Sequence, residues 1–327
     1  MMKKILLVIA ALLVIAIAFL YIRTRPSGDI NNYSGHFIND EATPSDSSVR
    51  ITFFGVSTIL FDDRKTQILI DGFFSRPSMV KALTSSIASD TSLIADVIQQ
   101  YGINRLNGIF VTHSHYDHGF DAGHVSKMTG AKLYGSNSTL NIGRGAGVPE
   151  SQLQLYEPNV DLQLGHFGVR VVPSKHSPGN ALKDDEVEIG APLKQPASWK
   201  AYTEGGSYDF LITHHGKKIY VKPSPNFISG ALDSLSADVL LIGIPTISKH
   251  GPDWRDQFYQ ENVTALEPSV VIPIHWDDFF NPLSDELVML PKFVCNAEED
   301  FDYFLERTNS DGIEFIILQG TKSYIVN

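Results

Sequence analysis

The sequence predicts an α/β protein, a four-layer αββα sandwich in which two β-sheets pack face to face and helices cover both outer faces. Short β-prone apolar runs alternate with helical patterns in two successive halves of the chain after residue 48. The 327 residues are enough for a substantial core, and the hydrophobic (43%) and charged (19%) fractions are those of a folded protein. A long apolar run near the N-terminus predicts one transmembrane helix before the sandwich.

Residues 1–24 are expected to be an N-terminal membrane anchor or a signal segment. Lys3 and Lys4 precede the uninterrupted apolar run 5–22, which as a helix would be about 27 Å long, close to the thickness of the hydrocarbon core. The small residues 16–18 could be a signal-peptidase site, but the apolar residues that follow favour an uncleaved anchor. The catalytic domain is then expected on the periplasmic or extracytoplasmic side, or secreted if the segment is cleaved.

The polar stretch 25–48 is predicted to be a linker, and the folded domain is expected over residues 49–327. Apolar spacing with a period of 3.6 predicts helices, and short apolar runs between turn residues predict strands. The predicted helices are residues 85–101, 121–129, 253–266 and 300–307. The predicted strands are residues 49–55, 67–72, 108–111, 131–134, 169–172, 209–212, 218–221, 238–244, 270–276, 314–318 and 323–326.

The most informative stretch is His-Ser-His-Tyr-Asp-His, which follows the apolar run 108–111. A short β-prone run that ends in polar residues predicts a buried strand that delivers its C-terminal loop to a site. His113 and His115 alternate and so point the same way in an extended segment, whereas Asp117 and His118 follow after a turn. Imidazole nitrogens and carboxylate oxygens are ligands of zinc, iron and manganese, so the pattern predicts a metal centre.

This His-x-His-x-Asp-His motif resembles the signature of the metallo-β-lactamase superfamily of metal-dependent hydrolases, which implies the αββα fold of that family. The Phe-Gly-Val-Ser-Thr segment and the Asp-Gly-Phe-Phe turn near the start of the domain are similar to the branch that contains sugar-phosphate lactonases and N-acyl-phosphatidylethanolamine phospholipase D. The resemblance runs from residue 49 to the C-terminus. Its supporting segments are residues 49–58, 67–74, 113–118, 171–176 and 270–276.

The resemblance implies a ligand set for one or two ions, with zinc expected and manganese or iron as alternatives. Three histidines leave a tetrahedral ion one open position, where a water of lowered pKa becomes the hydroxide that attacks an ester, lactone or phosphodiester. Asp117 is also expected to orient this nucleophile, as its counterpart does in the resembled family. We expect one ion on His113, His115 and His176, and a second on Asp117, His118 and His275.

One departure from the family pattern predicts a weakened second site. Family members with two ions carry a bridging aspartate, whereas Ser224 occupies that position here and Lys222 adds positive charge nearby. Two cations held close together repel each other at any protein-like dielectric constant, and Asp117 alone would offset them. One tight ion and one weak or absent ion are therefore expected, unless Asp277 or Asp278 supplies a substitute carboxylate.

Four further features have two interpretations each. Asp71, at a strand end, either orients a ligand imidazole or caps the following turn. His250 follows a strand end and is either a substrate-side residue or a solvent-exposed one, and the hairpin residues His214 and His215 offer the same choice. The segment 177–206 is either a substrate-contacting flap, with Trp199 and Tyr202 as apolar walls, or a surface excursion.

The leading function is a membrane-tethered metal-dependent hydrolase acting on a small-molecule or lipid-like substrate. The alternative is a non-catalytic binding or scaffold module that keeps the fold with a degraded metal centre. A formal net charge of −11 makes the surface repel phosphate backbones, so no nucleic-acid partner is expected. The single cysteine, Cys295, excludes an intrachain disulfide framework and a thiolate-rich metal site.

Overall fold

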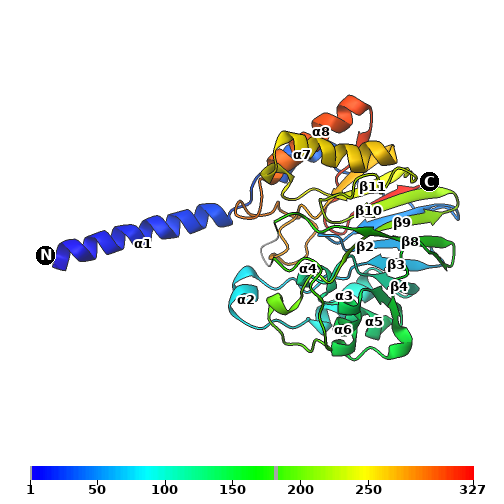
Figure 1. The fold of residues 1–327 in the computed structure, drawn as a ribbon, viewed down its shortest axis with the longest axis horizontal. Helices are drawn as coiled ribbons and strands as arrows, with labels where there is room; N and C mark the ends of the chain where they lie inside the picture. The colour runs from blue at the N-terminus through cyan, green and yellow to red at the C-terminus, as the bar shows by residue number, and fades with distance from the viewer. Residues whose placement is uncertain (1, 180–182) are drawn as a thin grey trace.

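The structure, a computed structural model, describes residues 2–179 and 183–327 and confirms the four-layer sandwich (Figure 1). Two seven-stranded sheets lie face to face between helices on both outer sides. In spatial order the first sheet contains β14 (Ser323–Val326), β1 (Val49–Phe53), β2 (Ile59–Asp62), β3 (Gln67–Ile70), β4 (Leu106–Phe110), β5 (Lys132–Gly135) and β6 (Leu153–Leu155). The second contains β13 (Glu314–Phe315), β12 (Val270–Ile274), β11 (Val239–Gly243), β10 (Lys217–Lys222), β9 (Ser207–His214), β8 (Phe167–Ser174) and β7 (Asp161–Leu164).

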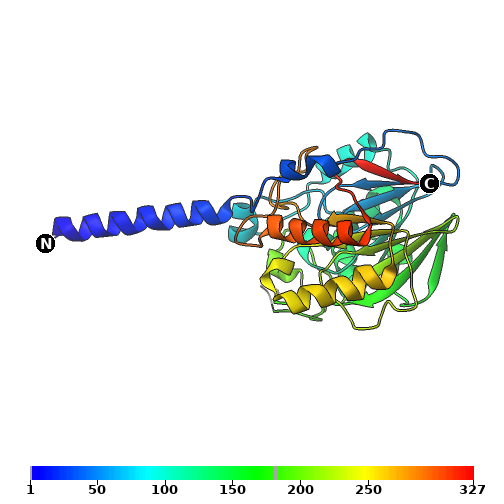
Figure 2. The same cartoon turned by 90° about the horizontal axis from the view of Figure 1, so that it is seen from above.

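Helices cover the outer face of each sheet (Figures 1 and 2). Those on the first sheet are α3 (Thr91–Gln100), α5 (Ala122–Thr129) and α6 (Asn137–Ala146), and those on the second are α7 (Pro252–Tyr259) and α8 (Ala297–Asp311). A π-helical turn, Gln260–Thr264, continues α7. The remaining helical elements are α1 (Met2–Thr24), α2 (Met79–Thr84), α4 (Tyr116–Gly119) and the 3₁₀ turns Ile30–His36, Glu150–Gln152, Trp199–Ala201 and Ile247–Lys249.

The alternation of side chains along the central strands explains the layers. In β3, Ile68 and Ile70 belong to the core between the sheets, whereas Leu69 belongs to the core beneath the helices of the first sheet. Phe110 and Ile109 of β4 divide in the same way. Successive side chains of a strand point to opposite faces, so a continuous apolar run supplies both cores at once.

The carboxyl ends of six strands meet at one edge of the sandwich. β3 pairs in parallel with β4, and β10, β11 and β12 are parallel to one another. β8 has the same direction as β10, because each pairs antiparallel with β9. The loops that leave these strands are therefore gathered in one place, which is where ligands bind in layered α/β folds.

The helix α1 extends away from the domain, and none of it is buried (Figure 1). It is the one helix among the described residues that is long and apolar enough to cross a membrane, and a signal sequence would pass the same test. Segment 25–48, predicted as a linker, lies along the domain instead of forming a free tether. The amide and hydroxyl of Ser27 donate hydrogen bonds to the carbonyl of Leu290, and Ile30 and Tyr33 are buried in the core.

Several element boundaries differ from the sequence prediction for local reasons. The helix expected from residue 85 begins at Thr91, because the Asp90 side chain accepts hydrogen bonds from the first backbone amides of α3 and Ile87 pairs with Ala197. The closing strand expected over 314–318 has two residues, since Ile317 bridges to Phe37 instead. The helices α2 and α6 and the strands β2, β6 and β7 were not predicted.

Candidate metal centre

Three loops bring the predicted metal ligands to the edge where the strand ends meet. The loop after β4 carries His113 and His115, and its turn α4 carries Asp117 and His118. His176 follows the end of β8, and His275 follows the end of β12. The structure therefore gathers all six predicted ligands in two adjoining groups, with the rings of His113 and His118 3.9 Å apart between their centroids.

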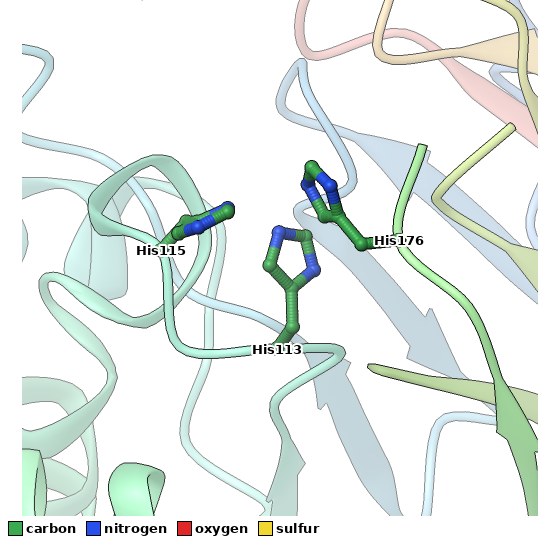
Figure 3. Close-up of side chains that lie close together, drawn as sticks. All are labelled: His113, His115 and His176. Atoms are coloured by element: carbon green, nitrogen blue, oxygen red, sulfur yellow. The ribbon is translucent and has the colours of Figure 1, made fainter. Parts of the chain in front are cut away.

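The first group is a triangle of imidazoles, with His113 and His115 on one loop and His176 on a facing segment (Figure 3). The three ring centroids are 4.7–4.8 Å apart, and one nitrogen from each ring lies within 4.8 Å of the others. Nε2 of His113 is buried and has no hydrogen-bond partner among the described residues. A buried nitrogen of this kind is costly unless something binds it, so this group fits a cation.

Burial and the neighbouring imidazoles keep the rings of His113 and His176 neutral. Burial lowers the pKa of His113 well below its ordinary value, and the neighbouring imidazoles lower it further. Burial likewise lowers the pKa of His176 to about 3. Neutral imidazole is the form that binds a metal ion, so both rings are prepared for binding at pH 7.

Two rings of the first group, those of His115 and His176, each have a hydrogen-bond partner outside the group. Nε2 of His115 lies 3.2 Å from Oδ2 of Asp184, and Nδ1 of His176 lies 3.1 Å from the carbonyl oxygen of Ser177. These contacts fix the rotation of the rings and leave the opposite nitrogen of each with its lone pair. Asp184 belongs to the segment predicted as a flap and was not among the predicted site residues.

The second group is more compact. Nε2 of His118 lies 3.2 Å from Nε2 of His275, and Oδ2 of Asp117 lies 3.6 Å and 3.4 Å from these two nitrogens. Tetrahedral ligands at 2.0–2.1 Å from a metal are separated by about 3.3–3.4 Å, so the triangle has the size that an ion requires. Burial would raise the pKa of Asp117, but His118 and His275 outweigh burial and hold this pKa well below its ordinary value. Asp117 is therefore an ionised ligand candidate.

Asp71 contacts a ring of this second group. Its Oδ2 lies 2.8 Å from Nδ1 of His118, and its Oδ1 accepts a hydrogen bond from the backbone amide of Thr112 at 2.8 Å. An ionised carboxylate only accepts, so Nδ1 of His118 carries the proton and Nε2 directs its lone pair at Asp117 and His275. Asp71 thus meets the first interpretation of its role, since it orients an imidazole; its other oxygen holds the metal loop at Thr112 and not the turn that follows Asp71.

The charges around the centre differ from the sequence prediction. Asp117 is not the only carboxylate available to offset cations, because Asp71 and Asp184 each stand behind a histidine. Lys222 was expected to add positive charge, but its Nζ is 3.1 Å from Oδ2 of Asp209 in a buried ion pair. The neighbouring Ser224 lines the same cavity as His176 and His275 and brings no charge to it.

Neither proposed substitute carboxylate is available. Asp277 is buried, pairs with Arg76 at 2.9 Å and accepts a hydrogen bond from the amide of Val56 at 2.6 Å. Asp278 accepts hydrogen bonds from its own loop at Phe280 and Asn281. The prediction of a substitute carboxylate is wrong, because Asp277 binds Arg76 and Val56 and Asp278 binds its own loop. Neither side chain belongs to one of the two ligand groups.

The two groups open into a cavity of about 450 Å³ with mainly apolar walls. Trp199 and Tyr202 line it, as the flap interpretation expects; residues 180–182 of that predicted flap lie outside the described residues. Lys249 is the one lysine or arginine among the described residues that line the cavity. The other apolar side chains at the walls are those of Ala82, Leu83, Tyr116, Pro178, Pro223, Pro225, Pro245, Phe279, Phe280, Leu290, Phe293 and Val294.

Three other predicted histidines are not on this cavity. The ring of His250 packs on Trp254, 4.1 Å between centroids, and the neighbouring Thr246 and Lys249 line the cavity instead. His214 ends β9, and the strand register places it opposite Phe167, at the far end of the sheet from His176. Substrate contact by His214 or His215 is therefore excluded by their position. The aromatic pair Phe279 and Phe280 was missed, although their place directly after the His275 strand was a usable signal.

Comparison with known proteins agrees with this geometry. The family model described as the metallo-beta-lactamase superfamily matches residues 51–288. A protein of Pyrobaculum islandicum named UPF0173 metal-dependent hydrolase is 32% identical over 232 residues, which cover 71% of this chain and 85% of the relative. A protein of the same name from Heliobacterium modesticaldum is 24% identical over 242 residues, 71% of this chain and 84% of the relative.

Solved structures share the fold at low sequence identity. The metallo hydrolase Igni18 of Ignicoccus hospitalis covers 86% of this chain and 99% of its own, with a TM-score of 0.51 and 16% identity. An isothiocyanate hydrolase from Delia radicum gut bacteria covers 84% and 98%, with a TM-score of 0.53 and 12% identity.

The fold and the two histidine groups define a metal-dependent hydrolase of the αββα type. The chain belongs to the metallo-beta-lactamase superfamily, as the sequence motif indicated.

Proposed function

We propose that this protein is a membrane-tethered metal-dependent hydrolase that cleaves an ester, lactone or phosphodiester bond in an amphiphilic substrate. The observation that supports this most directly is the apolar cavity into which both ligand groups open. Its wall includes Phe293, whose backbone amide donates a hydrogen bond to the carbonyl of Arg23 at the end of α1. A substrate that reaches the reacting centre would thus enter beside the membrane helix.

We assign one ion to the first group and a second, weaker ion to the second group, with zinc as the leading metal and manganese or iron as alternatives. A bound divalent ion would supply a water of lowered pKa and polarise the scissile bond. Asp71 and Asp184 offset part of the cation charge through the imidazoles that they contact. Ser224 supplies no charge between the two groups, which supports weaker binding of the second ion.

The remaining steps belong to the protein's own side chains. Asp117 is ionised and lines the cavity, so it would accept a hydrogen bond from the attacking water and orient it. The ammonium of Lys249 would pair with an anionic group of the substrate. Trp199 and Phe279 would pack against its apolar part and exclude water from the site.

Exposed apolar side chains near the cavity support a location at the membrane surface. In α2, Leu83 lines the cavity while 57% exposed, and Val80 on the same helix is 72% exposed. Phe293 is 37% exposed at the rim. If α1 spans the bilayer with its short N-terminal tail in the cytoplasm, this apolar surface would meet the outer leaflet on the periplasmic side.

The test uses the full-length chain in detergent micelles, loaded with zinc and offered p-nitrophenyl esters of short and long acyl chains, a lactone and bis-p-nitrophenyl phosphate. We expect turnover of at least one class and at least a 100-fold loss in the double variant His113→Ala/His176→Ala. Bound metal without turnover of any substrate would contradict the hydrolase proposal and favour a binding module.

A matched pair of variants on α2 tests the apolar part of the proposal. Leu83→Ser is expected to lower kcat/KM for the long-chain ester and leave the short-chain ester within twofold, because only the long chain reaches this wall. Val80→Ser is the control, since Val80 is equally apolar and does not line the cavity. Equal effects of the two variants, or no dependence on chain length, would remove the amphiphilic substrate from the proposal.

A further inference from the structure

A second collection of histidines lies at the end of the sandwich away from the metal centre. His166 directly precedes β8, His214 ends β9 and His215 begins the turn into β10. The strand β8 separates this cluster, which we call the distal histidine cluster, from His176 at its other end. Eight residues in extended conformation span roughly 25 Å, so the cluster is separate from the site described above.

One nitrogen from each of these three rings lies within 4.8 Å of the others. The ring of His215 is 4.6 Å from that of His214 and 4.9 Å from that of His166, measured between centroids. His214 is buried, whereas His166 and His215 are exposed to solvent. The rings of His166 and His214 are 6.0 Å apart, so this triangle is wider than that of the first group, whose centroids are 4.7–4.8 Å apart.

A buried carboxylate orients two of the three rings. Oδ2 of Asp63 lies 3.1 Å from Nδ1 of His166 and 3.2 Å from Nε2 of His214. Because an ionised carboxylate only accepts hydrogen bonds, each of these nitrogens carries the ring proton. The lone pairs of the two rings are then on Nε2 of His166 and Nδ1 of His214. This is the arrangement in which carboxylates prepare histidines for metal binding.

The geometry of the turn explains the hydrogen bonds of only one of the two carboxylate oxygens of Asp63. Its Oδ1 accepts hydrogen bonds from the amides of Lys65 and Thr66 and so caps the turn between β2 and β3. The same turn does not require Oδ2 to hold two imidazoles that come from residues more than a hundred positions away. Nδ1 of His214 is moreover buried with no hydrogen-bond partner in the described part of the chain. A buried acceptor without a partner is destabilising, and a cation would satisfy it.

We propose that His166, His214 and His215 form a further binding site for a divalent metal of the borderline class, such as zinc, nickel or copper. Three neutral imidazoles are the donor set that these ions prefer over magnesium or calcium. The exposed rings of His166 and His215 make the site reachable from solvent without passage through the catalytic cavity. A bound ion would join the turn after β2 to the β9–β10 hairpin through Asp63 and His214, and so stabilise that end of the sandwich.

The test counts metal ions in the full-length protein. The chain is stripped with a chelator, incubated with zinc, passed through a desalting column and assayed for bound zinc per chain. We expect His166→Ala/His215→Ala to hold one zinc fewer than the unaltered chain, and its zinc affinity at that site to fall at least tenfold. Both altered side chains are exposed, and circular dichroism shows whether the fold is retained; His166→Gln/His215→Gln repeats the measurement if the alanine variant unfolds.

Two further variants separate the distal cluster from other sources of zinc. His124→Ala removes an imidazole on α5 outside all three ligand groups and is expected to leave the count unchanged. His176→Ala is expected to lose zinc from the catalytic centre while the distal ion remains. The proposal is overturned if the distal double variant binds as many zinc ions as the His124→Ala protein with the same affinity, or if both distal variants keep the fold and the count.

Discussion

Replacement of Asp71 by asparagine isolates the contribution of one orienting carboxylate to metal binding. In the native chain Asp71 accepts hydrogen bonds from Nδ1 of His118, the Ser57 hydroxyl, and the amide and hydroxyl of Thr112. An asparagine amide can still accept from Thr112, but its NH₂ group would face a ring nitrogen that also donates. The ring proton is then expected to move to Nε2 of His118, which is the atom directed at Asp117 and His275.

The expected magnitude follows from the role of such partners. Loss of a carboxylate behind a ligand histidine weakens metal binding by about 10–100-fold, which equals about 1.4–2.7 kcal/mol. The assay is competitive zinc titration of the full-length protein, with the weaker site followed separately from the tighter one. We expect the second-group ion to be affected and the first-group ion to change by less than threefold.

The matched control is Asp121→Asn. Asp121 is also a fully buried carboxylate that accepts hydrogen bonds from two backbone amides and a serine hydroxyl, at Phe74 and Ser75. It contacts no imidazole among the described residues. Both variants should lose comparable stability, but only Asp71→Asn should lose zinc affinity. Equal zinc affinities in the two variants would refute the orienting role of Asp71.

Three further predictions follow from other groups. Asp184→Asn should lower the affinity for the first-group ion by about tenfold in the same titration, because the carboxylate that fixes the His115 ring is neutralised. An unchanged affinity would show that the ring is held by packing alone. Ser224→Asp should raise the affinity for the second ion at least tenfold by restoring a charge between the two groups, and no gain would mean that charge does not limit this site. Burial raises the pKa of Asp300 to about 7. Between about pH 4 and 7 the folded state therefore holds a proton that the unfolded state has released. The free energy of unfolding should fall as pH rises through this window. In urea titrations of Asp300→Asn, the fall in the free energy of unfolding between about pH 4 and 7 should be smaller by up to about 4 kcal/mol. A fall as large as that of the native chain would contradict burial of Asp300 as its cause.

The comparison of sequence with structure shows where local pattern is sufficient. The short apolar runs at β3 and β4 predicted strands, and the structure places their side chains in two separate cores. The capping by Asp90 set the start of α3, and this boundary was misjudged because the apolar spacing continued on its N-terminal side. The helix α6 was not recognised because its buried face consists mostly of glycine and small polar residues, with Leu140 and Ile142 as its large apolar side chains.

The sequence by itself indicated the fold class, the membrane-length apolar helix and the four ligand residues from His113 to His118, because each of these lies in one run or one short motif, whereas His176 and His275 were assigned through the family resemblance. Only the tertiary structure decided which carboxylates stand behind the histidines. His115 and Asp184 are 69 positions apart and Asp63 and His214 are 151 apart, so no local period relates them. The direction of a side chain in a loop is set by packing between distant elements, and for this reason the charge balance of the centre and the distal histidine cluster emerged only from the folded chain.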